Sequence, residues 1–135
     1  MGRCSVLVVN QAITHVGIIA NATFVLGLSI GREMNASEFG DAVIDGSGSL
    51  HHALTNMKHI VRKAGDTKIK TLRAQLLAQP GVTVIDYTEA ASTSDYDEYV
   101  RTLENQKSDE IIYRAIHILG PQEIVEPLTK NLSRL

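Results

Sequence analysis

Polar residues follow the first apolar run of the chain, at positions where a ligand could be held. The run Ser5–Val9 ends at Asn10, and His15, Gly17 and Asn21 follow at the predicted start of a helix. In α/β proteins, ligands bind beyond the carboxyl end of a buried strand and beside a helix N-terminus, where free backbone N–H groups attract polar and anionic groups. We therefore expect these four residues to bind a ligand.

A second polar pair follows another apolar run. The run Val82–Ile85 ends at Asp86, and Thr88 lies two residues further on. If this run is a strand parallel to the first, both strand ends converge on one cleft, in which Asp86 could orient a water and Thr88 or Asn21 could donate to an oxyanion. The alternative, of equal weight, is that the polar side chains at both strand ends only cap backbone groups.

The five histidines raise the question of a metal site. His51, His52 and His59 form the only cluster, and adjacent residues of a strand point to opposite faces. No carboxylate accompanies them at the spacing of a known metal motif, and no phosphate-binding loop, dinucleotide fingerprint or nucleophile elbow is present. We therefore expect no metal and no cofactor. The apolar run Ile111–Leu119 is interrupted only by Arg114 and His117, and we expect His117 to be a hydrogen-bonded core histidine.

The elements that would position these residues alternate between strand and helix. Strands are predicted at 5–9, 82–85 and 111–119, with a further one possible at 58–61 and a hairpin whose turn is Asp45–Gly48. Helices are predicted at 17–30 and 67–79, from Ser94 onward, and from Pro121 onward, with a kink or restart at Pro127. This alternation predicts an α/β sandwich around a mixed sheet.

Composition limits the classes of protein further. A chain of 135 residues is expected to form one domain, residues 1–135. The single cysteine, Cys4, excludes an intrachain disulfide, and no secretory signal or membrane span is recognised, so we expect a cytoplasmic protein without a membrane partner. The helix at 17–30 is apolar almost all round, which predicts a homodimer that covers its second face.

Charge is distributed unevenly along the chain. Residues 58–73 carry six basic side chains against one acidic side chain, whereas residues 86–110 carry eight acidic against two basic. The basic segment could hold phosphates, although a solvated helix face is the favoured interpretation.

Four segments carry a resemblance that covers nearly the whole chain. They are Val-Leu-Val-Val-Asn at 6–10, Gly-Ile-Ile-Ala-Asn-Ala at 17–22, Val-Ile-Asp-Tyr-Thr-Glu-Ala at 84–90 and Ile-Leu-Gly-Pro at 118–121. Together they resemble the bacterial family called domain of unknown function 2000 (DUF2000), which looks like a branch of the type II peptidyl-tRNA hydrolase fold. The resemblance implies a three-layer α/β/α sandwich with a mixed, roughly four-stranded sheet, commonly seen as a homodimer.

The resemblance to the hydrolases also has implications for the site. Type II hydrolases have a Gly-Lys pair opening the first helix and a Gln and a His within it. Here the lysine position falls on Gly17 or Ile18, the glutamine position on Asn21 and the histidine position near Phe24. The hydrolase Asp and Thr map onto residues 86 and 88, with altered spacing.

The missing lysine decides between two functional interpretations. Ester hydrolysis needs a positive charge at the developing oxyanion, and neither Gly17 nor Ile18 supplies one. The sequence therefore favours a non-hydrolytic binding module for a small polar ligand or an RNA end. The alternative is a carboxylic-ester hydrolase acting on peptidyl-tRNA.

Overall fold

A mixed sheet of five strands forms the centre of the computed structural model, which describes residues 2–135. The order is β5-β6-β1-β4-β7. The strands are β1 (Arg3–Asn10), β4 (Lys58–Ala64), β5 (Thr83–Thr88), β6 (Tyr113–Pro121) and β7 (Ser133–Arg134). β1 pairs with β4 in parallel, and β6 is antiparallel to both β1 and β5. It follows that β1 and β5 run in the same direction, so both end at the same edge of the sheet.

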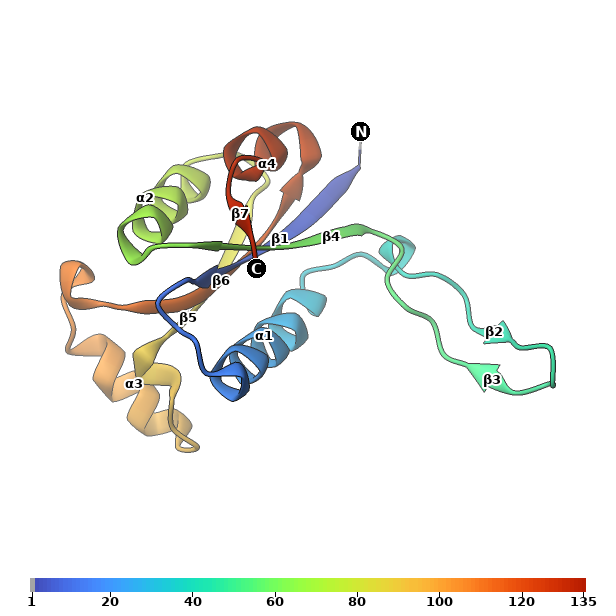
Figure 1. Cartoon of the computed structure of the whole chain (residues 1–135), viewed down its shortest axis with the longest axis horizontal. Helices are drawn as coiled ribbons and strands as arrows, with labels where there is room; N and C mark the ends of the chain where they lie inside the picture. The colour runs from blue at the N-terminus through green and yellow to red at the C-terminus, as the bar shows by residue number, and fades with distance from the viewer. Residues whose placement is uncertain (1) are drawn as a thin grey trace.

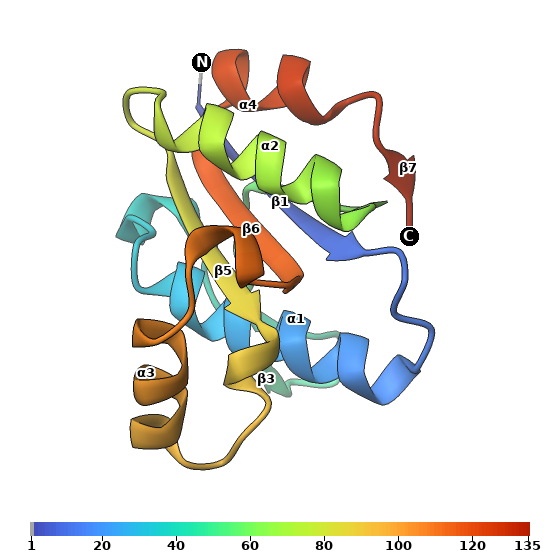
Figure 2. The ribbon, with the colours of Figure 1, turned by 90° about the vertical axis from the view of Figure 1, so that its left-hand side faces the viewer.

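Helices cover both faces of this sheet (Figure 2). α2 (Asp66–Leu77) and α4 (Gln122–Thr129) lie on one face, and α1 (Val16–Gly31) lies on the other. Successive residues of β1 contribute to opposite layers, with Val6 and Val8 under α2 and α4, and Leu7 and Val9 under α1. The unbroken apolar runs seen in the sequence are therefore strands buried on both faces.

Two segments lie outside these layers. α3 (Tyr96–Glu104) packs beside the short 3₁₀ turn η2 (Glu89–Ala91) that follows β5. The strands β2 (Val43–Ile44) and β3 (Leu50–His51) form a separate hairpin that projects away from the body (Figure 1). The remaining short turns are η1 (Ala36–Glu38) and η3 (Ser108–Glu110).

The mixed α/β fold expected from the sequence is confirmed, with one strand more than the resemblance implied. The fifth strand, β7, pairs only Ser133 and Arg134 with β4, and two residues carry no periodicity that a sequence could reveal. α4 continues through Pro127 and ends two residues later. No helix in residues 2–135 combines the length and the apolar character needed to cross a membrane.

Candidate ligand-binding cleft

A hollow of about 460 Å³ lies where α1 begins, beside the segment that leaves β5. Its size falls within the range of small-molecule sites. The start of α1, the end of β5, the start of β6 and the segment at 91–94 form its wall. The lining residues are His15, Gly17, Ile18, Asn21, Tyr87, Ala91, Ser92, Thr93, Ser94 and Arg114.

A second hollow of about 530 Å³ continues from the first along α1. The two share part of their wall, including Asn21 and Tyr87. Beyond this shared wall the second hollow has an apolar side that includes Val25 and an aromatic side formed by Tyr96 and Tyr99 of α3. The two tyrosine rings lie 5.6 Å apart between centroids. The two hollows together form a cleft with a polar end and a more apolar end.

The start of α1 is left open to a ligand. His15 occupies the N-cap position but makes no capping hydrogen bond with its side chain, and the first turn contains no acidic residue. The free N–H groups and the helix dipole therefore favour an anion there. The His15 ring lies over Gly17, since a Cβ at position 17 would meet it at 3.0 Å. Glycine at this position allows the ring to lie close to the helix backbone at residue 17.

Arg114 brings a positive charge to the same place through a β-bulge. Tyr87 pairs with Ala115, and Thr88 pairs with Tyr113, so Arg114 is the extra residue on β6. A bulge redirects a side chain, and bulges occur often beside functional sites. Arg114 lines the polar end of the cleft, and no carboxylate within residues 2–135 forms an ion pair with it.

Tyr87 connects α1 to the wall of the cleft. Its hydroxyl oxygen lies 3.3 Å from Asn21 Oδ1 and 3.2 Å from the carbonyl oxygen of Ala91. The ring is buried against the core under α1. Tyr87 is not among the site residues expected from the sequence, although both of its neighbours are.

Of the expected site residues, His15, Gly17 and Asn21 line the polar end of the cleft together. Asn10 is buried next to it, where its Nδ2 donates to the carbonyl of Tyr113 at 2.9 Å and its Oδ1 accepts from the amide of Ala12 at 3.0 Å. Both polar groups of Asn10 therefore serve the backbone, which is the capping role considered as the alternative.

Asp86 and Thr88 lie differently from the other expected residues. Successive residues of β5 alternate between faces, so Tyr87 points toward α1 while its two neighbours point toward α2. The Asp86 carboxylate lies 3.3 Å from Nε of Arg73 on α2, although Asp86 also lines the more apolar end of the cleft. The Thr88 hydroxyl is buried without a hydrogen-bond partner in the described chain. The structure does not bring these two side chains into the polar end.

The comparison with known families gives a clear match. Residues 3–135 match the family model described as protein of unknown function (DUF2000). The chain belongs to the DUF2000 family. A search of curated proteins finds no match. The structure resembles that of Atu0240, a protein of unknown function from Agrobacterium tumefaciens strain C58, with a TM-score of 0.86 and 15% identity over 100% of this chain and 98% of that chain. At that identity, the similarity establishes a shared fold.

In this DUF2000 protein the cation at the cleft comes from an unexpected element. The resemblance to type II hydrolases implies a lysine at the start of the first helix, where Gly17 and Ile18 stand. The structure instead places Arg114 of β6 opposite that helix start. A charged residue inside an otherwise apolar strand was the only sequence signal for it, since a bulge depends on the pairing with β5.

Proposed function

We propose that this DUF2000 protein binds a small ligand through an anionic group, a carboxylate or a phosphate, at the polar end of the cleft. The observation that carries the proposal is the position of Arg114 without an acidic partner opposite the open N-terminus of α1. An arginine guanidinium binds either anion with two parallel N–H donors, and the helix N-terminus adds backbone donors.

The more apolar end of the cleft suggests what the anion is attached to. Val25 forms one wall, and the rings of Tyr96 and Tyr99 form another. Aromatic side chains pack favourably against a flat ring. The polar groups along the rim could hydrogen-bond to hydroxyl or amide groups of the ligand. The ligand class is therefore an anion that carries a ring, which includes the nucleotide at an RNA end and small aromatic acids.

Binding without hydrolysis is the favoured form of this function. The carboxylate expected to orient a water, Asp86, is paired with Arg73, and the Thr88 hydroxyl is buried on the same side of the sheet. One observation favours the second candidate, an ester hydrolase acting on peptidyl-tRNA: the imidazole of His15 lines the polar end and could act as a base. Cleavage of peptidyl-tRNA that is abolished by His15→Ala would establish that candidate instead.

The proposed anion site is tested by calorimetric titration with phenyl phosphate. We expect Arg114→Gln to weaken binding at least tenfold, because it removes the charge that pairs with the phosphate. Arg101→Gln is the matched control, because it removes the same charge from the exposed face of α3, outside the cleft. Equal affinities for the wild-type protein and Arg114→Gln would refute the site.

We also propose that the protein is a homodimer. α1 contains no acidic or basic side chain over its whole length, and Phe24 and Leu28 remain about two-thirds exposed on its outer face. A surface helix ordinarily carries charged or polar residues on its outer face. Sedimentation of a single species with the mass of one chain at tens of micromolar would contradict the homodimer.

A further inference from the structure

The hairpin that projects from the body has no core of its own. We define the arm as residues 39–55, closed at its base by the bridge between Phe39 and Thr55. Every residue from 39 to 54 is exposed, and β2 and β3 pair only two residues each. A two-stranded hairpin is at best marginally stable alone in water. Its large apolar side chains are Phe39, Val43, Ile44, Leu50 and Leu54.

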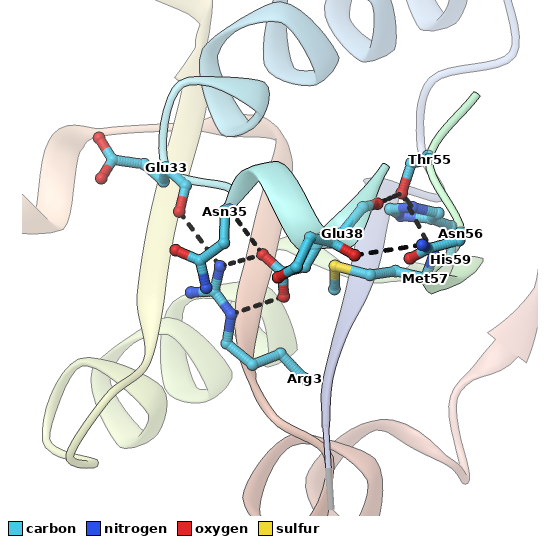
Figure 3. A network of polar contacts seen from close by, with 9 residues as sticks. Arg3, Glu33, Asn35, Glu38, Thr55, Asn56, Met57 and His59 are labelled. Atoms are coloured by element: carbon cyan, nitrogen blue, oxygen red, sulfur yellow. Dashed lines mark hydrogen bonds and ion pairs between the residues drawn. The ribbon is translucent and has the colours of Figure 1, made fainter. Parts of the chain in front are cut away.

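The arm is nevertheless held firmly at its base (Figure 3). The guanidinium of Arg3 on β1 pairs with the carboxylate of Glu38, with Nε donating to Oε2 at 2.9 Å. The carbonyl of Glu38 accepts from the Thr55 hydroxyl at 2.9 Å and from the Asn56 amide at 3.0 Å. These bonds join the two ends of the arm to each other and to the start of β1, the central strand of the sheet, so the base gives the arm a defined starting direction.

The tip of the arm is also held locally. Asp45 Oδ1 accepts from the amides of Ser47 and Ser49, and Oδ2 lies 2.8 Å from Nε2 of His51. The bond to His51, followed by the backbone amides, lowers the pKa of Asp45. Gly48 adopts a positive φ of 86° to close the turn. The exposed hairpin is therefore hydrogen-bonded at both its base and its tip.

The outer face of α1 supplies a matching surface. Phe24 and Leu28 lie one helical turn apart, with Ala20 before them and Gly27 beside them. A Cβ at Gly27 would meet nothing within 4 Å in the described chain. The small residues leave open space next to the two large side chains. Because α1 carries no charge, no ion would lose its hydration when this face is covered.

These two surfaces hold half of the large exposed apolar side chains of residues 2–135. Of the fourteen, five lie on the arm and two on the outer face of α1, and the arm points away from its own body (Figure 1). Together they present on the order of 800 Å² of surface, close to the roughly 800 Å² that each partner of a standard interface buries. At the ordinary rise per residue of a strand, the part of the arm from Gly40 to Ser47 is roughly 25 Å long. The helix α1 has about the same length.

We propose that each chain of the homodimer lays its arm across α1 of the second copy. This inference rests on the homodimer proposed above and names its contact. A twofold axis would repeat the same arm-to-helix contact twice, so that one interface covers both exposed apolar surfaces. Ile44 and Leu50 are opposite one another across the hairpin, so they share the face that would meet Phe24 and Leu28.

Cross-linking between differently tagged copies tests this contact directly. One copy carries Leu50→Cys and the other carries Leu28→Cys, and a short bismaleimide joins cysteines that lie close together. The native Cys4 is buried, so it does not compete. We expect the arm-to-helix product to dominate over the arm-to-arm and helix-to-helix products obtained when both copies carry the same substitution. A dimer that gives only like-to-like products would overturn the arm exchange and leave the homodimer standing, whereas a monomer would overturn both.

Charged substitutions that would dissociate the dimer give a second test. We expect Ile44→Asp on the arm and Phe24→Asp on α1 each to weaken dimerisation at least tenfold, because each places a carboxylate in the apolar contact. Leu77→Asp is the control, since Leu77 is an exposed apolar residue at the end of α2, on the other face of the sheet. The arm exchange is refuted if Ile44→Asp dimerises as tightly as Leu77→Asp. An unchanged circular dichroism spectrum shows that each variant folds.

Discussion

At the scale of single residues, His117 shows how burial controls a charge. Its Nε2 lies 2.7 Å from Oγ of the buried Ser5, and the same Oγ lies 2.9 Å from Nδ1 of His59. Burial, followed by the nearby charge of His59, lowers the pKa of His117 from 6.5 to about 4. The folded protein therefore holds this ring neutral at neutral pH, as expected for a core histidine.

This lowered pKa predicts how stability depends on pH. Below pH 6.5 the unfolded chain takes up a proton at His117 that the folded chain refuses until about pH 4, so the free energy of unfolding falls over that range. Over this range we expect protonation at His117 to lower the free energy of unfolding by about 3 kcal/mol. Urea unfolding at pH 7 and pH 4 should show a smaller loss in His117→Gln than in the wild type, with exposed His52→Gln as the control. Identical losses in all three proteins would contradict this role of His117.

Asn21 is the residue whose binding and structural roles can be separated. Its Oδ1 lies 3.3 Å from the Tyr87 hydroxyl, which also has the Ala91 carbonyl as a partner. Asn21→Ala should therefore cost only about 1 kcal/mol of stability while weakening binding of phenyl phosphate. Calorimetry and thermal unfolding of the same variant measure the two effects. A much larger loss of stability with unchanged affinity would make Asn21 a purely structural residue.

At the scale of elements, the connection between the arm and β1 is the most testable. The bond to Arg3 is the main cause of the lowered pKa of Glu38. We expect Glu38→Gln to weaken this anchor and to speed amide hydrogen exchange at 40–54, with little change in the exchange of β1 and β6. Glu33→Gln is the control, since Glu33 meets Arg3 only through its backbone carbonyl. Unchanged exchange in the arm would show that Arg3 does not hold it.

The ion pair between Arg3 and Glu38 also depends on pH, but through a carboxylate with a lowered pKa and not through a histidine. Because the pKa of Glu38 is lowered in the folded chain, its contribution is present above the ordinary carboxylate pKa and is lost as the pH falls through the folded value. Acidification below the ordinary carboxylate pKa of 4.5 should therefore loosen the base of the arm. Hydrogen exchange of the arm on either side of pH 4.5, compared between the wild type and Glu38→Gln, measures this loss, and an equal response of both proteins would contradict it.

The elements also show what the sequence could predict about the site. The apolar runs and the glycine-rich turn are local signals, and they predicted the central strands, α1 and the hairpin. Successive residues of β5 point to opposite faces of the sheet, so either Tyr87 or its two neighbours, Asp86 and Thr88, face α1. Which of these occurs depends on which face of the sheet α1 covers. The bulge at Arg114 depends on the register of two strands that lie far apart in the chain. Pairing of this kind leaves no local pattern.

At the scale of the whole molecule, two surfaces with different chemistry lie along α1. Gly17 and Asn21 face the cleft, whereas Phe24 and Leu28 form the apolar outer face. One uncharged helix therefore contributes to ligand binding near its start and to dimerisation further along its length. We expect dimerisation to be insensitive to Arg114→Gln, as measured by sedimentation. A monomeric Arg114→Gln variant would show that the two surfaces are not independent.

A crystal structure with phenyl phosphate would show whether an anion binds between Arg114 and the start of α1. We expect the phosphate against the guanidinium of Arg114 and the backbone amides near Gly17, with the ring toward Tyr96 and Tyr99. Phosphate bound only along the basic segment 58–73, with the cleft empty, would refute the anion site.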